Sequence, residues 1–370
     1  MKRVVLLGGG HTHLEVVRRF GASPAAPAEV TLVDPAQFAT YSGMLPGLIA
    51  GHYSFQDCHV DLARLAQHSG MRFLQQSACG IDTVRRQVAL SDGALLDYDI
   101  LSLDVGSTPP TAGIPGAAEH AIAAKPFTTF AQRWDRLVVS AEAGTLRKLV
   151  VVGAGAAGLE LVFAMQYRLA QAGVVQSIDY AVITDAQCVL PDHNARTRAV
   201  IERVLVERNI AGHVASPVMR VESDAVIVSG AARIDSDATI WATGAGAPAW
   251  LATTGLALNT RGFIRVNEGL SSLSNSEIFA AGDCATLDSH RYPKSGVYAV
   301  RQGPVLAENL RRALAGERLS PYRPQERALA LISTGNRYAV ASYGSIAFAS
   351  SWVWRWKDYI DRKFMRRYRV

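Results

Sequence analysis

The chain has few cysteines and lacks a long apolar run. Its cysteines, Cys58, Cys79, Cys188 and Cys284, are scattered, and no two of them form a CxxC pair. This spacing argues against a disulfide framework, a zinc ribbon and a dithiol redox centre. No segment reaches the ~18 consecutive apolar residues of a membrane-spanning helix, and the apolar run after Arg3 is too short for a secretory signal. We therefore expect a cytoplasmic protein without a membrane span.

The chain also lacks a widespread excess of basic residues. Its net charge is +6, but residues 355–370 alone contain seven Lys or Arg and two Asp, so the rest of the chain is nearly neutral. Broad binding to nucleic acid needs a wider basic surface, and no nucleic-acid partner is predicted. With 49% hydrophobic and 19% charged residues, the 370-residue chain has the composition of a globular protein with room for two domains.

A glycine-rich turn between an expected strand and an expected helix opens the chain. Residues 4–7 form a continuous apolar run typical of a buried strand, Gly8 and Gly10 make a tight turn, and a helix should begin at His11. The free amides and the positive dipole end at the start of such a helix suit a phosphate. The next strand ends in Asp34, which is placed to take ribose hydroxyls. The segment therefore predicts a dinucleotide site.

Two histidines distinguish this turn from the usual GxGxxG pattern. His13 stands where the third glycine is expected, and His11 lies two residues before it. Residues i and i+2 of a helix point to different faces, which does not favour a shared metal ion. We interpret both as turn or ligand-contacting residues and predict no metal site.

The same pattern returns in the middle of the chain. Residues 149–160 align with residues 4–15 and have all three glycines, Gly153, Gly155 and Gly158. Two such turns in one chain predict two dinucleotides, one for each domain.

The acid after the second turn bears on the choice of nicotinamide nucleotide. Asp185 comes just after the strand expected at residues 180–183. A carboxylate there favours the free ribose 2′-hydroxyl of NADH, and NADPH remains the alternative. A later strand runs into a small-residue turn at Gly244, where the chain is expected to cross back to the first domain.

A second acid, far along the chain, is expected to complete the first site. Residues 278–281 predict a strand that ends in Gly282 and Asp283, at the carboxyl edge where open α/β sheets hold ligands. Glycine allows close backbone approach, and the carboxylate can accept hydrogen bonds from a sugar or ribityl hydroxyl. Gly106 lies in the turn that closes the first part of this domain.

Two further segments are candidates for contact with a flat aromatic cofactor. The loop at residues 40–47 contains Tyr41 and is interpreted as a wall against such a ring, with an ordinary structured loop as the alternative. A helix should open near Gly296 and Arg301, and its first amides suit an anionic reduced ring. Plain helix capping is the alternative there.

The last clear pattern is an amphipathic helix. Its apolar row recurs every four residues, at Trp352, Trp356, Ile360, Phe364 and Tyr368. Its basic row is Arg355, Arg362, Arg366 and Arg369. Indoles on one face and arginines on the other suit an anionic membrane surface. Burial against its own domain or a second subunit is the alternative.

The order of these motifs resembles that of the FAD-dependent pyridine nucleotide-disulfide oxidoreductase superfamily. The motifs are the two glycine turns, then residues 242–244, then residues 278–283. Without a redox dithiol, the chain looks most like the type II NADH dehydrogenase and sulfide:quinone reductase members. More narrowly, it resembles the oxidoreductase module found fused to selenide, water dikinase, at residues 8–13, 40–53, 124–126 and 354–368.

The resemblance implies two cofactors and the residues that hold them. It implies FAD at Gly8, Gly10, Asp34 and Asp283, and NAD(P)H at Gly153, Gly155 and Gly158. It further implies that Glu160 lies near the nicotinamide and that Tyr41 and Arg301 flank the isoalloxazine ring. Members that act on sulfide need active-site cysteines, which the scattered cysteines of this chain do not match.

We therefore predict an α/β protein with two Rossmann-like dinucleotide-binding domains, the second inserted in the first, and a C-terminal amphipathic helix. Residues 1–120 and 260–330 are expected to bind FAD, residues 121–259 to bind NAD(P)H, and residues 331–370 to form the C-terminal segment.

The predicted function is that of an FAD-dependent NAD(P)H dehydrogenase, which passes a hydride to the flavin and electrons on to an acceptor. A quinone is the leading acceptor, reached by peripheral contact with the cytoplasmic face of a membrane. An accessory flavoprotein that partners a selenium- or sulfur-handling enzyme is the alternative. The sequence leaves open the acceptor and the oligomeric state, a homodimer included.

Overall fold

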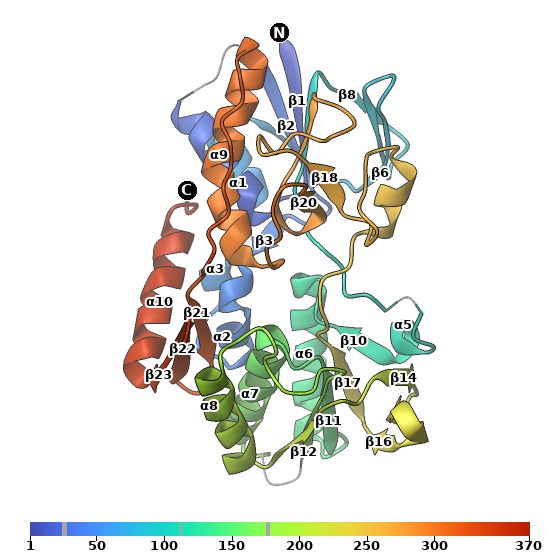
Figure 1. The fold of residues 1–370 in the computed structure, drawn as a ribbon, viewed down its shortest axis with the longest axis vertical. Coiled ribbons are helices and arrows are strands. Elements are labelled where there is room, and N and C mark those ends of the chain that lie inside the picture. The colour runs from blue at the N-terminus through green and yellow to red at the C-terminus, as the bar shows by residue number, and fades with distance from the viewer. Residues whose placement is uncertain (24–27, 112, 175–177) are drawn as a thin grey trace.

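The computed structural model describes residues 1–23, 28–111, 113–174 and 178–370. It has two halves, each built around a five-stranded parallel sheet, and a C-terminal segment that lies beside both (Figure 1). The predicted α/β class, with parallel sheets and a C-terminal helix, is confirmed.

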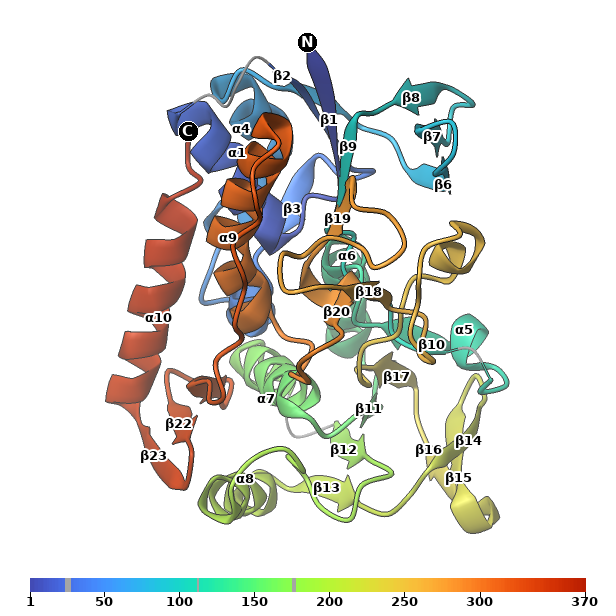
Figure 2. The same cartoon turned by 45° about the horizontal axis from the view of Figure 1, so that its top comes forward.

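The sheet of the upper half has its most apolar strand at the centre. The strand order is β19 (Ile278–Ala280), β9 (Ile100–Leu103), β1 (Lys2–Leu7), β2 (Ala28–Val33) and β5 (Arg72–Leu74). β1 pairs in parallel with both β2 and β9 and is buried from Val4 to Leu7, as its apolar run predicts. Helices α1 (His11–Ala22) and α9 (Gly296–Ala315) pack against each other beside this sheet (Figure 1 and Figure 2).

The sheet of the lower half lies within one continuous stretch of chain. Its order is β10 (Ala121–Ala123), β17 (Ala238–Trp241), β11 (Lys148–Val152), β12 (Asp179–Ile183) and β13 (Ile210–His213). The long helices of this half are α6 (Phe127–Glu142), α7 (Ala156–Gln171) and α8 (Ala195–Glu207). The chain leaves the upper half after β9 and returns to it after β17.

Shorter elements surround the two sheets. The upper half adds the pair β3 (Phe38–Thr40) and β4 (His59–Asp61), the meander β6 (Ala78–Asp82), β7 (Gln87–Leu90) and β8 (Leu95–Asp97), the pair β18 (Ile264–Val266) and β20 (Ala285–Leu287), and helices α2 (Leu45–Ile49), α3 (Phe55–Cys58) and α4 (Leu62–His68). The lower half adds α5 (Ala117–His120) and the meander β14 (Val218–Val221), β15 (Ala225–Val228) and β16 (Arg233–Asp235). Single 3-10 turns cover Ser42–Met44, Ser229–Ala231, Ala249–Thr253 and Gly282–Cys284.

The short helix α2 joins the two halves. It follows the loop that contains Tyr41, but its Leu45 and Ile49 are buried in the hydrophobic core of the lower half, and α2 packs on α7. Protein interiors are close-packed, so separating the halves would open a cavity around these side chains. The contact therefore opposes hinge motion next to the candidate site.

The C-terminal segment is a small antiparallel sheet followed by a helix. Strands β21 (Ala330–Ser333), β22 (Ala339–Tyr343) and β23 (Ile346–Ser350) lead into α10 (Ser351–Arg366), and the Ser350 hydroxyl caps this helix by accepting from the Val353 amide at 3.1 Å. α10 leans on β22 and β23 and runs back along the upper half (Figure 1).

The apolar row predicted for α10 does not face one way. Phe364 and Tyr368 are buried in the core of the upper half, whereas Trp352, Trp356 and Ile360 are exposed. Residues four apart are rotated by about 40° around an α-helix, so a row with this spacing winds from solvent into the core over four steps. For Phe364 and Tyr368, the alternative of burial against the protein's own domain therefore holds, and only the first three members of the row remain available for a membrane surface.

None of the helices in the described part of the chain has the length and apolarity that crossing a bilayer requires.

Candidate active site

We call each glycine turn, together with the side chains around it, a cradle. The first cradle, at Gly8 to Gly10, lies at the carboxyl ends of β1, β2, β9 and β19. Gly8 has a φ of +93°, and a Cβ added to it would collide with the Asp104 carbonyl. A Cβ added to Gly10 would collide with the Asp104 carboxyl group. No group in the described ranges accepts a hydrogen bond from the amides of Gly10 or His11. The turn therefore needs glycine for close packing and offers backbone donors to an anionic ligand.

Asp34 lies at the end of β2, beside this turn. Its carboxylate accepts hydrogen bonds from the Gly9 amide at 2.6 Å and from the Ala36 amide at 2.8 Å. Burial raises the pKa of Asp34, and the two amides oppose the shift. The acid thus fixes the glycine turn at the place predicted for ribose recognition.

His13 shows how the turn dispenses with its third glycine. Its buried ring places Nδ1 2.6 Å from the Gly8 carbonyl oxygen and Nε2 2.8 Å from Ser102 Oγ. The carbonyl can only accept, so Nδ1 donates to it, and in the neutral ring Nε2 then accepts from the hydroxyl. Burial lowers the pKa of His13 to about 4, in keeping with that tautomer. Ser102, on β9, leaves the space that the larger side chain of His13 occupies.

Asp104 directly follows β9 and has no counterpart among the residues predicted from the sequence. Its Oδ2 accepts hydrogen bonds from the amides of Thr12 at 2.8 Å and His13 at 3.0 Å, in the first turn of α1. The only sequence signal for it is an acid placed right after a buried strand, the same signal that identifies Asp34.

Asp283, in the 3-10 turn after β19, meets a lysine from the other half of the molecule. Its Oδ2 accepts from Lys125 Nζ and from Ser107 Oγ, both at 3.0 Å. Burial opposes its ionisation, but Lys125 and Ser107 hold the pKa of Asp283 below its usual value. Lys125 lies between β10 and α6, so the ion pair bridges the halves. Gly106, with a φ of +70°, precedes Ser107 at the same edge.

The loop that contains Tyr41 forms a wall beside this edge. The Tyr41 ring stacks on Phe364 of α10 at 4.2 Å between centroids, and the His11 ring lies 5.4 Å from Tyr41. Burial lowers the pKa of His11 to about 4. The start of α9 approaches the same loop, because a Cβ added to Gly296 would lie 3.3 Å from Ser42 Oγ.

On α9, Gln302 rather than Arg301 points into the cradle. The Arg301 side chain is exposed. Gln302 is fully buried, accepts from the Gly282 amide at 2.6 Å and donates to Tyr292 Oη at 2.8 Å. The structure therefore brings Gln302, which was not predicted, to the turn that holds Asp283.

The second cradle, at the start of α7, is more open. A Cβ added to Gly153 would collide with the Ala242 carbonyl, and one added to Gly158 would collide with the Gly153 carbonyl. Nothing in the described structure lies within 4 Å of a Cβ added to Gly155. Nearby, the buried Thr243 hydroxyl has no hydrogen-bond partner among the described residues. Tight packing beneath and open space above are what a bound diphosphate requires.

The other residues predicted for the second nucleotide lie around this turn. Asp185 is exposed after β12, and Gly244 is exposed after β17. Both follow strands that flank β11 in the sheet, so they share the carboxyl edge with Gly153.

Glu160 lies in the first turns of α7 and is linked to the C-terminal helix. Its Oε1 accepts from the Ser333 amide at 2.8 Å. Burial raises the pKa of Glu160 to about 7, opposed by Lys357 of α10. Lys357 Nζ lies 2.7 Å from Asp361 and donates to the Gly43 carbonyl at 2.5 Å. The acid predicted near the nicotinamide is thus coupled to the loop that contains Tyr41.

The cysteines lie apart, and among the described residues no group of three or more His, Cys, Asp or Glu side chains could hold a metal ion. All four cysteines are free. Cys284 is buried next to Asp283, and burial raises its pKa to about 12, so it is a thiol at neutral pH.

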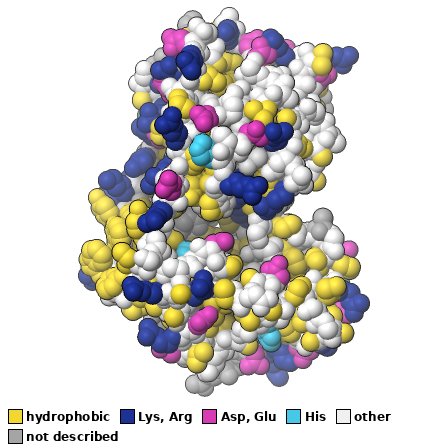
Figure 3. Space-filling view, in the orientation of Figure 1, with side chains coloured by type: hydrophobic (Ala, Val, Ile, Leu, Met, Phe, Trp, Pro, Cys, Tyr) yellow, Lys and Arg dark blue, Asp and Glu magenta, His cyan; other side chains and the backbone are white. Residues whose placement is uncertain are grey.

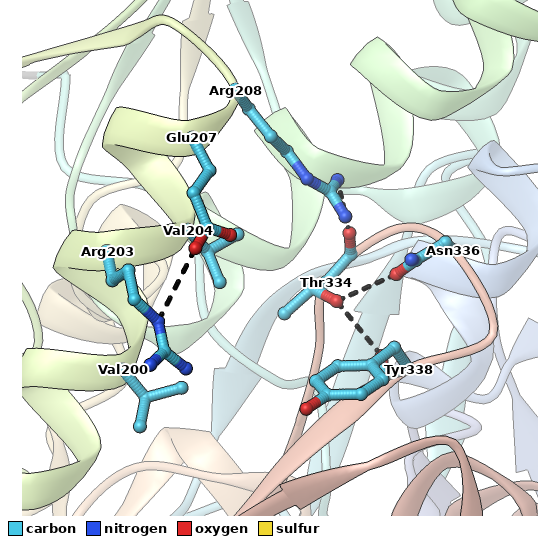
Figure 4. A pocket seen from close by; sticks show the side chains of 8 residues that line it. All are labelled: Val200, Arg203, Val204, Glu207, Arg208, Thr334, Asn336 and Tyr338. Atoms are coloured by element: carbon cyan, nitrogen blue, oxygen red, sulfur yellow. Dashed lines mark hydrogen bonds and ion pairs between the residues drawn. The ribbon is translucent and has the colours of Figure 1, made fainter.

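Two cavities lie away from the cradles. One, of about 210 Å³, separates α8 from the turn after β21 (Figure 4). There Arg208 donates to the Thr334 carbonyl at 2.6 Å and the Thr334 hydroxyl bonds to Asn336, so its polar groups mainly tie the C-terminal sheet to α8. The other, of about 430 Å³, lies between α2 and α6 and is largely apolar, with Tyr53 and Trp134 among its lining residues.

Comparison with known proteins places this arrangement in a family. The family model of the pyridine nucleotide-disulphide oxidoreductases matches residues 2–303. The chain belongs to this family.

Similar proteins of known activity cover most of the chain. The type II NADH:quinone oxidoreductases of Staphylococcus epidermidis and Staphylococcus aureus are each 23% identical to it, over 85% of this chain and 83% of theirs. The solved structure of the sulfide:quinone oxidoreductase from Aquifex aeolicus has a TM-score of 0.84 at 19% identity, over 100% of this chain and 92% of that chain. NDH2 from Plasmodium falciparum in complex with NADH has a TM-score of 0.79 at 14% identity, over 99% and 98%.

Membership confirms the enzyme class and the cofactors that were predicted. The protein is an FAD-dependent NAD(P)H oxidoreductase. The residues of both cradles fit a nucleotide. Each cradle has a glycine turn where added side chains would collide with the surrounding chain. In the described structure, the first cradle also has backbone amides without an acceptor, and the second has a buried hydroxyl without a partner.

Proposed function

We propose that this protein passes a hydride from NADH to FAD and the electrons on to a quinone at a membrane surface. Bound FAD supplies the hydride acceptor and the electron store, and the chain positions both nucleotides. The relatives named NADH:quinone oxidoreductases support a quinone. The observation that carries the membrane location is an exposed apolar surface on the C-terminal segment.

This C-terminal apolar surface combines the start of β23 with the first half of α10. Its most exposed members are Trp352, Ile346 and Phe348, at 62%, 61% and 57%. Figure 3 shows apolar side chains gathered over the lower end of α10 and β23, with Lys and Arg beside them. A large apolar patch rimmed by charge indicates an interaction site.

Its charge and its indoles favour a bilayer as the partner. Arg355, Lys363, Arg366 and Arg367 are exposed on α10. Tryptophan prefers the membrane interface, and each basic residue near an anionic leaflet contributes about 1 kcal/mol. A hydrophobic quinone dissolves in the same bilayer.

The site residues have assigned roles in this proposal. FAD is held by Gly8, Gly10, His11, Asp34, Gly106, Gly282, Asp283 and Gly296. The nicotinamide nucleotide is held by Gly153, Gly155, Gly158, Asp185 and Gly244. Glu160 and Tyr41 act beside the reacting rings, and Asp185 favours NADH. The corresponding domains are residues 1–120 with 260–330 for FAD, 121–259 for NADH and 331–370 for the membrane.

Vesicle flotation tests the membrane part. The variant Trp352→Ser/Trp356→Ser should lose most of its binding to vesicles of phosphatidylglycerol and phosphatidylcholine at low salt, because it removes the two indoles of the C-terminal apolar surface. The matched control Val139→Ser/Val206→Ser, exposed at 64% and 76% on α6 and α8, should bind like the wild type. A wild type that stays unbound at low salt would refute membrane contact.

Anaerobic stopped-flow absorbance tests the reaction. NADH should bleach the flavin rapidly, and a short-chain quinone added afterwards should restore its colour. Bleaching without recovery would reject the quinone and keep the dehydrogenase. No bleaching by NADH or NADPH would reject the dehydrogenase activity and favour an accessory flavoprotein, for which the resemblance to modules fused to selenide, water dikinase indicates a selenium- or sulfur-handling partner.

A further inference from the structure

The cradle for FAD contains a carboxyl group that the diphosphate must meet. Asp104 is 3% exposed, and its Oδ2 holds the amides of Thr12 and His13 at 2.8 and 3.0 Å. Amides in the first turn of such a helix are the usual donors to a nucleotide phosphate. In this chain a side chain already occupies two of them.

The other oxygen of this carboxyl group, Oδ1, lies against Gly10 and Gly282, the two glycines at the edge of the cradle. A Cβ added to Gly282 would collide with Asp104 Oδ1, and one added to Gly10 would collide with the whole group. The amides of Gly10 and His11 donate to no acceptor in the described chain, so they are the donors left for a phosphate. Since Gly10 lies against the Asp104 carboxyl group, a phosphate on the Gly10 amide would lie next to this group.

The groups around Asp104 offer little positive charge. From the turn after β19 come Asp283 and Cys284, and from α1 come His11 and His13, whose rings are neutral above about pH 4. Burial raises the pKa of Asp104 to about 7; the two amides oppose the shift and Asp283 adds to it. Lys125 is bound to Asp283. Two anions side by side in a buried site are strongly disfavoured.

We propose that Asp104 is an FAD-binding residue that acts as a neutral carboxylic acid. Oδ2 keeps its two amide hydrogen bonds, while Oδ1 carries a proton and donates it in a hydrogen bond to a phosphate oxygen of FAD. When the Asp104 carboxyl group of the flavin-free protein is ionised, it must take up one proton from the solvent as FAD binds. Nothing in the family resemblance or in the predicted residues assigns this role.

The pH dependence of FAD affinity tests the proposal. The full chain, stripped of flavin, is titrated with FAD and followed by flavin fluorescence between about pH 6 and pH 8.5. The Kd of the wild type should be nearly constant at the acid end and rise by about tenfold per pH unit above about pH 7, because an ionised Asp104 must first be protonated. Asp104→Asn keeps the acceptor oxygen and the donor but cannot ionise, and its Kd should change less than about twofold over the same range.

Two controls separate Asp104 from other titrating groups. Burial lowers the pKa of Lys294, beside Cys284 and Asp283, to about 8, so Lys294 titrates in this range in both proteins and the difference between them is the readout. Asp92→Asn, an exposed acid in the turn after β7, should keep the slope of the wild type. An equal slope in the wild type and Asp104→Asn, or no slope in the wild type, would overturn the proposal.

A second measurement needs no variant. Calorimetry of FAD binding to the wild type in two buffers of different ionisation enthalpy gives the number of protons exchanged. At about pH 8 uptake should approach one proton, and near pH 6 it should be small. Zero uptake at the higher pH would reject the neutral-acid role even if Asp104→Asn failed to fold.

Discussion

At the scale of single residues, Asp283 gives the most direct test of the flavin site. Asp283→Ala removes the carboxylate proposed to accept flavin hydroxyls and leaves Lys125 without its partner. A hydrogen bond to a charged group contributes about 1.5–3 kcal/mol, so FAD should bind at least about tenfold more weakly. The ratio of flavin to protein absorbance in the purified variant measures this. Asp288→Ala, an exposed acid paired with Arg265, should keep its flavin, and full occupancy in Asp283→Ala would disprove the assignment.

Gly155→Val should separate the two nucleotides. The valine side chain would enter the open space over the second cradle, where the diphosphate of NADH must approach. We expect the variant to keep its FAD and to lose about 100-fold or more in the rate of flavin reduction at low NADH, measured by stopped-flow. Gly212→Val, in β13 and also without close neighbours among the described atoms, should behave like the wild type. Loss of flavin together with reduction would contradict the division between the sites.

The two histidines of the first turn should make folding sensitive to acid. Burial lowers the pKa of His11 and His13 from 6.5 to about 4, so as the pH falls the unfolded chain takes up these protons first. The unfolded state then binds more protons than the folded state, and the free energy of unfolding should decrease between about pH 6.5 and pH 4. Urea denaturation at several pH values measures the slope. His13→Gln cannot be protonated and should have a shallower slope, whereas an unchanged slope would show that His13 does not contribute.

Single residues also show where the sequence stops being informative. Asp34 and Asp283 were predicted as site residues because each follows an apolar strand, and the structure places both at the carboxyl edge of the upper sheet. Asp104 has the same position after β9, but its carboxyl group points inward onto the amides of α1. The spacing of apolar residues does not predict the direction in which a side chain points. Arg301 and Gln302 differ by one position on α9, and the rotation of that helix, set by packing on α1, decides which reaches the cradle.

At the scale of elements, α10 is more than a surface helix. Its Lys357 forms an ion pair with Asp361, donates a hydrogen bond to the Gly43 carbonyl and lowers the pKa of Glu160 through its charge. The sequence predicted the helix from its amphipathic pattern, but not this polar contact, because Lys357 and Asp361 belong to the charged composition that indicated solvent. The strands β1 and β11 were predicted, because a continuous apolar run followed by a glycine turn has few alternatives, whereas the strands β21 to β23 that lead into α10 were not.

Lys357→Met tests this coupling through pH. Glu160 acts beside the reacting rings in the proposed function, and a protonated carboxyl group there can give a proton to the acceptor as it is reduced. That step should therefore slow as the pH rises through about 7, where this carboxyl group loses its proton. Without Lys357 the burial of Glu160 is less compensated, its pKa should rise, and the midpoint of the pH profile should move up by about one unit. Stopped-flow reoxidation by a quinone at several pH values gives the midpoint. Arg362→Met, on the same helix and 40% exposed, should leave it in place, and an unmoved midpoint in Lys357→Met would rule the coupling out.

At the scale of the whole molecule, the repeat of the glycine turn predicted two nucleotide-binding halves, and the fold agrees. The contacts between the halves could not be predicted. Leu45 and Ile49 of α2 lie in the core of the other half, and Lys125 reaches Asp283 across the junction. Such contacts join segments far apart in the sequence, and no local pattern records which distant partner a buried leucine or a paired lysine will meet.

The order of the strands has a consequence for how the protein is made. The lower sheet needs only the continuous stretch from β10 to β17, whereas the upper sheet receives its edge strand β19 long after β1 and β9. During synthesis the strands of the lower sheet can therefore pair on the ribosome while β9 still has an unpaired edge. Gly10 and Gly282 face each other across Asp104 only once β19 has emerged, so capture of the flavin should be a late event in biogenesis, and truncated nascent chains that end before β19 should carry none.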